Sequence, residues 1–573
     1  MNRGHRLLIG FAAFCALWGA SVKAADHVAL DGRIHLPNGQ FAEGVIVSAK
    51  RQGSTITVSV ASNDQGYYAF PRTRLPPGLY SLDIRAVGYD LAESMSPDVT
   101  TQDTVHADLK LRNVDHIETQ LSNAEWLMSA PGTERDKSST LLCVDCHTYQ
   151  RIFMSTYNAD TLPLVVERMG GYSPGTMPGQ SQLRPDTIAG HPERFKDIAQ
   201  YLSSVNLSSG LRNYGLQTLP RPRGRATHMI VTEYQLPRAE SQPHDVIVDK
   251  EGAAWYVDFG RQYLGKLDPK TGNVKEYQVP ITKPGFPLGL LDLEFDEDGN
   301  PWVGMMMQAA IGKFDRRTEK FSVYTMPQDE ANENNLQIGM VEPRHMHVDG
   351  KVWMVVSARS GFDGMQRLDV RTGEFERFDV YASMRGGSAS PGGGGEGEVP
   401  GRNMYAGPAH GTYGIATDSR NNVYFADFAN DAVSMIGRLD AHTRKLDWFR
   451  IPTSYARPRR LFMDSKDQLW IAEFRANKIA MFDTRSEHFQ EWDIPEGNYP
   501  YYVVGDRNGE AWSGSEFNDR ILRLNPGTKE TTEYLLPHST NIRRVFVDNS
   551  TTPVTIWIGN NHAASIVKVE PLD

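Results

Sequence analysis

The pentapeptide Cys143-Val144-Asp145-Cys146-His147 holds the residues of this chain whose types and spacing indicate the most specific chemistry. C-x-x-C-H is the attachment motif of a c-type haem. The two thiols add to the haem vinyl groups, and the adjacent imidazole lies beneath the iron as its proximal ligand. The motif therefore predicts one covalent haem c held by Cys143 and Cys146, with His147 bound to the iron.

Other chemistries of a C-x-x-C pair fit this chain less well. A thioredoxin-like redox pair needs a βαβ context, which the neighbouring sequence lacks. A structural zinc site needs a second pair of ligands, and the only other cysteine is Cys15, near the N-terminus. An incidental C-x-x-C without chemistry is the remaining alternative.

A methionine that follows the motif is the expected sixth iron ligand, because a thioether raises the reduction potential relative to a second histidine. Met177 lies in Gly175-Thr-Met-Pro-Gly179, where proline and glycine would fix its approach to the iron. Met169 ends a predicted helix and is the alternative. We favour Met177 and assign Met154 to the core. His191 could bind the iron instead, but an exposed histidine at the start of a helix is the favoured interpretation.

The N-terminus has the order of a secretory signal peptide. A basic start precedes an apolar run at 7–19 and the small residues Ala24 and Ala25, which form a cleavage site. The run is too short to span a bilayer, and no later segment has the length and apolarity of a membrane helix. The sequence predicts a soluble periplasmic protein whose signal peptide is residues 1–24 and is removed together with Cys15.

Composition limits the classes of partner. The 573 residues are enough for several domains, and the formal net charge is −10. An acidic chain argues against nucleic acid or anionic membranes as partners. It is compatible with the docking of a basic electron-transfer partner in the periplasm.

The elements that would position these residues form three domains, so the expected fold is multidomain. Residues 28–112 have the pattern of a small β-sandwich, with apolar alternation separated by turns rich in Pro, Gly, Asn and Asp. The order of Gly44-Val-Ile-Val, Asp64-Gln-Gly-Tyr-Tyr-Ala-Phe and Pro77-Gly78-Leu-Tyr resembles the carboxypeptidase regulatory-like domain, a transthyretin-like sandwich. The resemblance implies an accessory module, sometimes for carbohydrate, or a stabilising spacer.

Residues 118–207 contain the C-x-x-C-H motif and three segments with helical spacing of apolar residues, at 121–128, 162–169 and 192–205. This order resembles a small all-α cytochrome c of class I type. The resemblance implies that the last helix packs across the first.

Residues 228–573 repeat a unit of four short strands. An aromatic anchor recurs in the second strand of each unit, mostly at intervals of 42 to 51 residues, which is the period of a propeller blade. The last unit is one strand short, and the segment 233–237 is a closing strand without a blade before it, so the two ends should pair. A Gly-rich insert at 386–407 is predicted to be a mobile loop. The anchors are Trp255, Trp302, Trp353, Tyr424, Trp470, Trp512 and Trp557, and they predict a seven-bladed β-propeller.

Polar residues of the repeats should meet at one mouth of the propeller channel, because the first strand starts and the second strand ends at the same rim. Charged groups in a concave site are candidates for catalysis or for anchoring an anionic ligand. Paired Arg and Glu that only neutralise each other are the simpler interpretation. The candidates are His244, His345, His410, Asp427, Arg459, Glu473, Glu516 and Arg543.

The repeat resembles the virginiamycin B lyase (streptogramin lyase) family in units such as Gln242-Pro-His-Asp-Val-Ile-Val248 and Leu469-Trp-Ile-Ala-Glu-Phe474. The resemblance covers residues 232–573 and implies a seven-bladed propeller. Lyases of that family open a cyclic depsipeptide by elimination, with Mg²⁺ held by Glu and His residues and a His base. Their Glu-Pro-His motif is replaced by Asn541-Ile-Arg-Arg544 in the last blade, and Glu342-Pro-Arg344 has Arg at the His position.

Together these features predict an exported haem c oxidoreductase or electron-transfer protein. Its propeller would bind a small molecule, a carbohydrate or a partner, and its haem would pass electrons to a periplasmic acceptor. One alternative is a Mg²⁺-dependent lyase with a cytochrome appendage. Another is a non-enzymatic binding protein in which the haem senses redox state.

Overall fold

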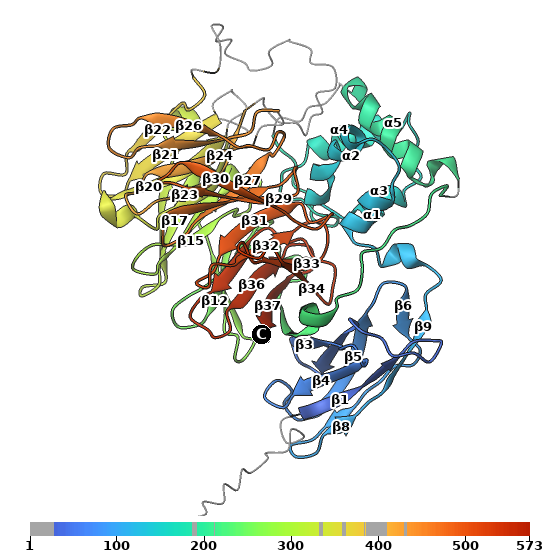
Figure 1. The fold of residues 1–573 in the computed structure, drawn as a ribbon. Coiled ribbons are helices and arrows are strands. Elements are labelled where there is room, and N and C mark those ends of the chain that lie inside the picture. The colour runs from blue at the N-terminus through green and yellow to red at the C-terminus, as the bar shows by residue number, and fades with distance from the viewer. Residues whose placement is uncertain are drawn as a thin grey trace, which may run out of the picture.

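The computed structural model describes residues 28–185, 192–210, 212–331, 336–357, 363–382, 384, 410–428 and 432–572. The predicted signal peptide, Cys15, His191 and the Gly-rich insert lie outside these residues. Figure 1 shows an N-terminal β domain, a group of helices and a large ring of sheets. None of the described helices has the length and apolarity needed to cross a membrane.

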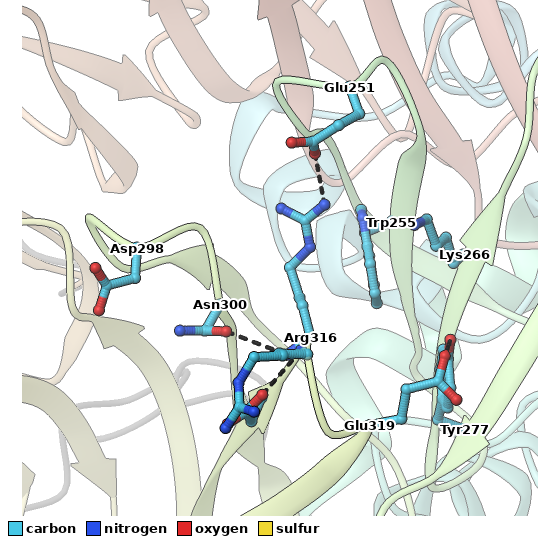
Figure 2. A pocket seen from close by; sticks show the side chains of 10 residues that line it. Glu251, Trp255, Lys266, Tyr277, Asp298, Asn300, Arg316 and Glu319 are labelled. Atoms are coloured by element: carbon cyan, nitrogen blue, oxygen red, sulfur yellow. Dashed lines mark hydrogen bonds and ion pairs between the residues drawn. The ribbon is translucent and has the colours of Figure 1, made fainter.

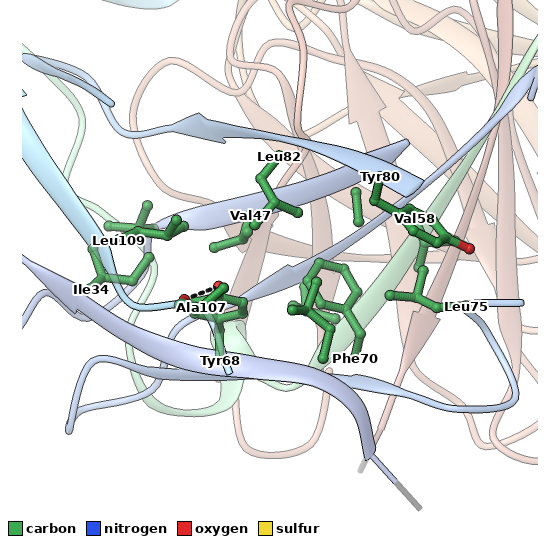
Figure 3. Close-up of a cluster of buried hydrophobic side chains, with 14 of the residues drawn as sticks. Ile34, Val47, Val58, Tyr68, Phe70, Leu75, Tyr80, Leu82, Ala107 and Leu109 are labelled. Carbon is green, nitrogen blue, oxygen red and sulfur yellow. Dashed lines mark hydrogen bonds between the residues drawn. The ribbon is translucent and has the colours of Figure 1, made fainter. Parts of the chain in front are cut away.

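The N-terminal domain is the predicted β-sandwich. One sheet has the order β4-β1-β9-β6 with β8 beside β1, and the other contains β3-β2-β5-β7. Alternate side chains point inward, so Tyr68 and Phe70 of β4 are buried in an aliphatic core (Figure 3). The strands are β1 (Val28–His35), β2 (Ile46–Arg51), β3 (Ile56–Ala61), β4 (Tyr67–Pro71), β5 (Gly78–Arg85), β6 (Tyr89–Leu91), β7 (Asp98–Val99), β8 (Val105–His106) and β9 (Leu109–Asn113).

The sandwich shares a sheet with the propeller. Strand β10 (Met229–Gln235) pairs with β3 on one side and with the C-terminal strand β37 (Ser565–Pro571) on the other, within one eight-stranded sheet. Ion pairs from Arg85 to Asp519, 2.5 Å, and from Arg74 to Glu570, 2.6 Å, join the same two domains. The sandwich therefore covers a sheet edge that β10 would otherwise expose.

The middle of the chain is helical, and the three segments predicted to be helical contain α1, α4 and α5. A capping box between Ser122 and Glu125 starts α1. Helix α5 packs on α4 and touches α3, whereas α1 packs on α3. Side chains of α1 and α5 share one hydrophobic core, while the larger contacts of α5 are with α4. The helices are α1 (Asn123–Ser129), α2 (Glu134–Ser138), α3 (Tyr149–Phe153), α4 (Leu162–Gly170) and α5 (Lys196–Val205), with 3₁₀ turns η3 (Leu141–Asp145) and η4 (Pro192–Phe195).

Among its described residues, the C-terminal part has six separate four-stranded antiparallel blades and a seventh built from β35, β36, β37 and β10. Blades one to three are β11 (Pro243–Val248), β12 (Ala254–Asp258), β13 (Tyr263–Leu267), β14 (Val274–Gln278); β15 (Leu293–Phe295), β16 (Pro301–Met305), β17 (Ala310–Asp315), β18 (Lys320–Thr325); and β19 (Gln337–Glu342), β20 (Lys351–Ser357), β21 (Asp363–Asp369), β22 (Phe375–Phe378).

Blades four to seven follow the same order. They are β23 (Thr412–Thr417), β24 (Val423–Asp427), β25 (Met435–Leu439), β26 (Leu446–Arg450); β27 (Pro458–Met463), β28 (Gln468–Glu473), β29 (Lys478–Asp483), β30 (His488–Asp493); β31 (Pro500–Gly505), β32 (Ala511–Ser515), β33 (Arg520–Leu524), β34 (Thr531–Leu535); and β35 (Val545–Asp548), β36 (Thr555–Asn560) and β37 with β10.

The seven blades close into a ring. Each first strand contacts its neighbour in the next blade, and β11 of blade one contacts β35 and β36 of blade seven. Strand β10 pairs antiparallel with β37 from Met229 opposite Pro571 to Gln235 opposite Ser565. The predicted pairing of the two ends is confirmed, and it removes the open edges of the ring.

The aromatic anchors all lie on second strands, as predicted, and several are fixed by a repeated hydrogen bond. The buried indole of Trp255 donates to Asp249, six residues earlier, at 2.8 Å. Trp302 donates in the same way to Asp296, at 3.0 Å. Because the aspartate lies in the turn before the second strand, the bond ties each turn to the core of its blade.

Candidate functional site

The C-x-x-C-H motif lies on the short 3₁₀ turn η3, and Cys146 follows its last residue. Cys143 and Cys146 are free thiols, and both are partly exposed. Burial, followed by the nearby Asp145 carboxylate, raises the pKa of both thiols to about 12. Two unlinked thiols on one turn are available for covalent attachment.

His147 is half-buried directly after the second thiol, and its Nδ1 lies 3.2 Å from the carbonyl oxygen of Thr148. Burial lowers the pKa of this imidazole, which favours the neutral form that binds metals. None of the described residues forms a hydrogen bond with its Nε2. A backbone bond at Nδ1 fixes the tautomer that leaves Nε2 for an iron.

The two methionine candidates are both half-buried in the helical domain. Met177 starts a tight turn in which the Gln180 amide donates to its carbonyl oxygen at 2.9 Å. Met169 lies in the last turn of α4. Met154 packs against the core of the helical domain, as predicted. The donors present, two thiols, an imidazole and a thioether, fit a haem c.

The propeller holds the two residues between the cysteines. Asn541 Nδ2 donates to the Val144 carbonyl oxygen at 3.2 Å, and Arg543 Nη2 donates to the Asp145 carbonyl oxygen at 2.6 Å. His562 Nε2 lies 3.4 Å from the same oxygen of Asp145. The turn that carries the motif is therefore hydrogen-bonded to the loops of blade seven.

A buried ion-pair cluster lies beneath this contact. Glu516 accepts from Arg459 Nη1 at 2.8 Å and lies 3.1 Å from Arg543 Nε. The Asp145 carboxylate lies 3.6 Å from Arg459 Nη2. Burial, and then repulsion by Glu516, raises the pKa of Asp145 to about 6. Arg459, Glu516 and Arg543, predicted as rim residues, thus meet at the motif.

The other rim candidates have contacts with residues outside the motif. His244 is fully buried, with Nδ1 2.6 Å from Asp245, and burial lowers its pKa to about 3. His345 Nδ1 lies 2.8 Å from Thr417 of the next blade, and His410 Nδ1 lies 2.8 Å from Asp427. Glu473 is buried beside the like-charged Glu491. The rim residues therefore do not form the single site that the sequence predicts, because several of these side chains bond to others in the same blade or in the next one.

The channel below the rim is filled by ion pairs. Arg460 contacts Asp245 at 2.9 Å and Asp292 at 2.6 Å, and Arg544 contacts Asp245 at 2.9 Å. Glu342, in the position of the Glu-Pro-His motif, is bound by the adjacent Arg344 at 2.6 Å. Among the described residues no group of three or more His, Cys, Asp or Glu could hold a metal ion. This donor set does not fit the Mg²⁺ that the lyase resemblance implies.

Hydrogen bonds in two further regions join the helical domain to the propeller. At the start of α1, the Ala124 amide donates to the Phe517 carbonyl and Asn123 Nδ2 donates to the Glu516 carbonyl, both at 2.8 Å. Farther along, Gln182 Nε2 donates to the Leu288 carbonyl at 3.0 Å, and Gln242 Nε2 donates to the Gly175 carbonyl at 2.9 Å. The loop that contains Met177 is thereby fixed to blades one and two.

Sequence reasoning missed several residues of this contact. Asn541 stood out only as a departure from the lyase motif, and His562 not at all. His562 lies two residues after the end of β36. The rim candidates include residues at the ends of second strands, and the same selection applied to the loop that follows each strand would have included His562. Asn123 and Gln182 carry no sequence signal, because their partners are backbone carbonyls far along the chain.

A separate charged cleft of about 500 Å³ lies between blades one and two, at the turns opposite the rim (Figure 2). Two of its carboxylates are paired: Glu251 contacts Arg316 at 2.5 Å, and Glu319 contacts the nearby Lys275 at 2.6 Å. The cleft contains none of the predicted site residues.

Comparison with known proteins identifies one part of the chain. Residues 29–112 match the carboxypeptidase regulatory-like domain family. The sandwich is such a domain. No curated protein matches the chain.

Among solved structures, the similarities concern the propeller fold alone. A streptogramin B lyase is 21% identical with a TM-score of 0.45, covering 59% of this chain and 97% of that one. Virginiamycin B lyase from Staphylococcus aureus is 20% identical with a TM-score of 0.44, covering 59% and 98%. The β-propeller domain of Myceliophteria thermophila Cps50 (Swd1) is 9% identical with a TM-score of 0.43, covering 60% and 100%. The propeller assignment rests on the strand pairing described above.

Proposed function

We propose that this chain is an exported haem c protein that transfers electrons. Residues 118–207 would form its cytochrome c domain, and the propeller would bind a small substrate or a partner. The observation that carries the proposal is the turn with Cys143 and Cys146, two free thiols, followed by the half-buried His147. The net charge of −10 is compatible with a basic periplasmic acceptor.

The residues of the turn have separate roles in this proposal. A bound haem c supplies one-electron transfer at its iron. Cys143 and Cys146 would hold the group by thioether bonds, and His147 would bind from the proximal side. The Thr148 carbonyl orients that imidazole through its bond to Nδ1. Met177, with Met169 as the alternative, would approach from the distal side.

The propeller would contribute position and charge. Arg543 and Asn541 hold the backbone between the two thiols, which restricts how the turn can move. The guanidinium groups of Arg459 and Arg543 lie beside Asp145, and both also pair with Glu516. The cluster therefore brings matched positive and negative charges next to the motif.

The test is the mass of the denatured protein and its reduced-minus-oxidised visible spectrum, after export from a host with haem c maturation. We expect a covalent haem adduct and an α-band, both lost in a Cys143→Ala/Cys146→Ala variant. An apo mass and no α-band in the unaltered protein would contradict the proposal.

The distal ligand is tested separately by Met177→Ala and Met169→Ala variants. We expect Met177→Ala to lose the far-red absorption band of a methionine–iron bond, while Met169→Ala keeps it. The reverse pattern would assign Met169, and retention of the band in both would exclude both candidates.

A further inference from the structure

A cavity of about 220 Å³ lies where the helical domain meets blades five and six. Leu141, the first residue of the turn that carries Cys143, forms one wall. Tyr455 and Ala476 line it from blade five, and Tyr499 lines it from the start of blade six. Neither cysteine of the motif lines this space, so it lies next to the thiol-bearing turn without being the place of attachment.

The walls combine aromatic rings with a few polar groups. The ring of Tyr499 packs 4.7 Å from that of Phe517, and the Arg475 guanidinium lies 4.7 Å from the ring of Tyr455. Glu134 of α2 also lines the cavity. Burial, and then the Glu134 carboxylate, raises the pKa of Tyr499 to about 12. The Tyr499 hydroxyl therefore stays protonated near a carboxylate.

The backbone at the two tyrosines is unusual. Tyr455 has φ +56° and Tyr499 has φ +43°, and they are the only aromatic residues among the described non-glycine residues with positive φ. Bulky side chains rarely adopt this conformation, and it persists only where surrounding contacts enforce it. For Tyr499 one such contact is the bond from its amide to Asn477 Oδ1, at 2.7 Å. Both outliers line one cavity, where strained residues often hold ligands.

We propose that this cavity binds a small neutral phenol or aromatic alcohol. A cavity of about 150 Å³ is enough for benzene, so the observed volume fits one substituted ring. The rings of Tyr455 and Tyr499 offer aromatic packing. One carboxylate, Glu134, and one guanidinium, Arg475, give the lining no net charge, which favours a neutral ligand with a hydroxyl group.

Such a ligand would be the substrate class of the proposed function, and its redox meaning rests on that function. A ligand in the cavity would touch Leu141, which is two residues from Cys143 in the same turn. A molecule bound in the cavity would therefore lie next to the turn that is proposed to carry the haem.

The experiment titrates p-cresol into the full-length protein and follows heat by calorimetry, with toluene as the probe that lacks a hydroxyl. We expect one p-cresol per chain and weaker binding of toluene. Ala476→Trp, which fills the cavity, should abolish binding. Tyr455→Ala should weaken it about ten-fold, because an aromatic contact and its buried area are lost.

Tyr157→Ala is the matched control, since Tyr157 is 47% exposed and Tyr455 is 45% exposed, and Tyr157 lies outside the cavity lining. It should bind p-cresol normally. Absence of binding, equal binding by Ala476→Trp, or equal binding of toluene would overturn the inference.

The same titration on protein whose haem content has been measured separates the two proposals. Binding of p-cresol without any covalent haem would overturn the electron-transfer function and leave the cavity assignment standing. Covalent haem without p-cresol binding would overturn only the cavity assignment.

Discussion

Glu516 lies between two guanidinium groups at the point where the C-x-x-C-H turn meets the propeller. It is fully buried, and Arg459 and Arg543 are almost fully buried. Ions in such a place stay charged only because they are paired. Glu516 thus holds the two arginines that contact the C-x-x-C-H turn, and through them it links blades five, six and seven.

Replacing Glu516 by Gln should destabilise the protein by about 3 kcal/mol, because a buried pair that loses one partner leaves the other charge uncompensated. Urea unfolding of the full-length protein measures the change. Glu251→Gln, which removes a carboxylate from an exposed pair with Arg316, is the control and should change the midpoint little. Equal midpoint shifts in the two variants would contradict the prediction.

Glu473 should make stability depend on pH. It is fully buried, and burial followed by the neighbouring Glu491 raises its pKa to about 9. At pH values between the unfolded pKa of Glu473 and about 9, the folded state binds one more proton than the unfolded state. The contribution of Glu473 to the free energy of unfolding is therefore complete at acid pH and is lost as the pH rises toward 9. Relative to the unaltered protein, Glu473→Gln should therefore gain up to about 1.4 kcal/mol per pH unit in this range.

Urea unfolding at several pH values between the two limits measures this difference. Glu491→Gln serves as a second variant, because it removes the neighbour and leaves the burial. A constant difference between Glu473→Gln and the unaltered protein across the range would show that Glu473 does not hold the proton.

At the scale of elements, β3 joins the sandwich to the propeller. It is paired on both edges, with β2 and with β10. Thr57 lies opposite Lys50 on one side and Glu233 on the other. The blade that closes the ring therefore depends on a strand from a different domain.

Thr57→Pro should destabilise this shared sheet by about 1 to 3 kcal/mol, because proline cannot donate and leaves a ladder acceptor unpaired. Amide hydrogen exchange of β10 should become faster than in Thr57→Ala, which keeps the donor. If exchange of β10 is the same in both variants, the sandwich does not support the closing blade.

For the whole molecule, the helical domain depends on close contact with the propeller at both ends. Gly175 lies in the loop with Met177, and a Cβ there would come 2.2 Å from the Phe259 carbonyl oxygen. The Phe259 carbonyl is a backbone group and cannot rotate away as a side chain can. Any larger residue at position 175 must therefore displace the loop.

Gly175→Ala should raise hydrogen exchange in the loop about ten-fold, since overpacking costs about 1 to 3 kcal/mol. Gly215→Ala is the control, because a Cβ added at Gly215 would meet no other atom within 4 Å. Loop exchange that is equal in the two variants would mean that the loop is not held by blade one.

Part of this protein follows from its sequence alone. The period of the anchors around Trp255 and Trp470 determines the propeller, because every blade repeats the same turn and core. The strand pattern of residues 28–112 determines the sandwich. Cys143, Cys146 and His147 form the C-x-x-C-H motif on which the haem c proposal rests, because this motif depends only on local spacing.

The tertiary structure alone decided how these parts meet. Asp145 reaches Arg459 and Arg543, which are hundreds of positions away, and sequence spacing carries no record of such a contact. The rim histidines were predicted as one group, but His244 pairs with Asp245 and His410 pairs with Asp427, so the two imidazoles have separate partners. The sheet shared by β3 and β10 was likewise invisible, since backbone hydrogen bonds between strands of different domains need no particular side chains.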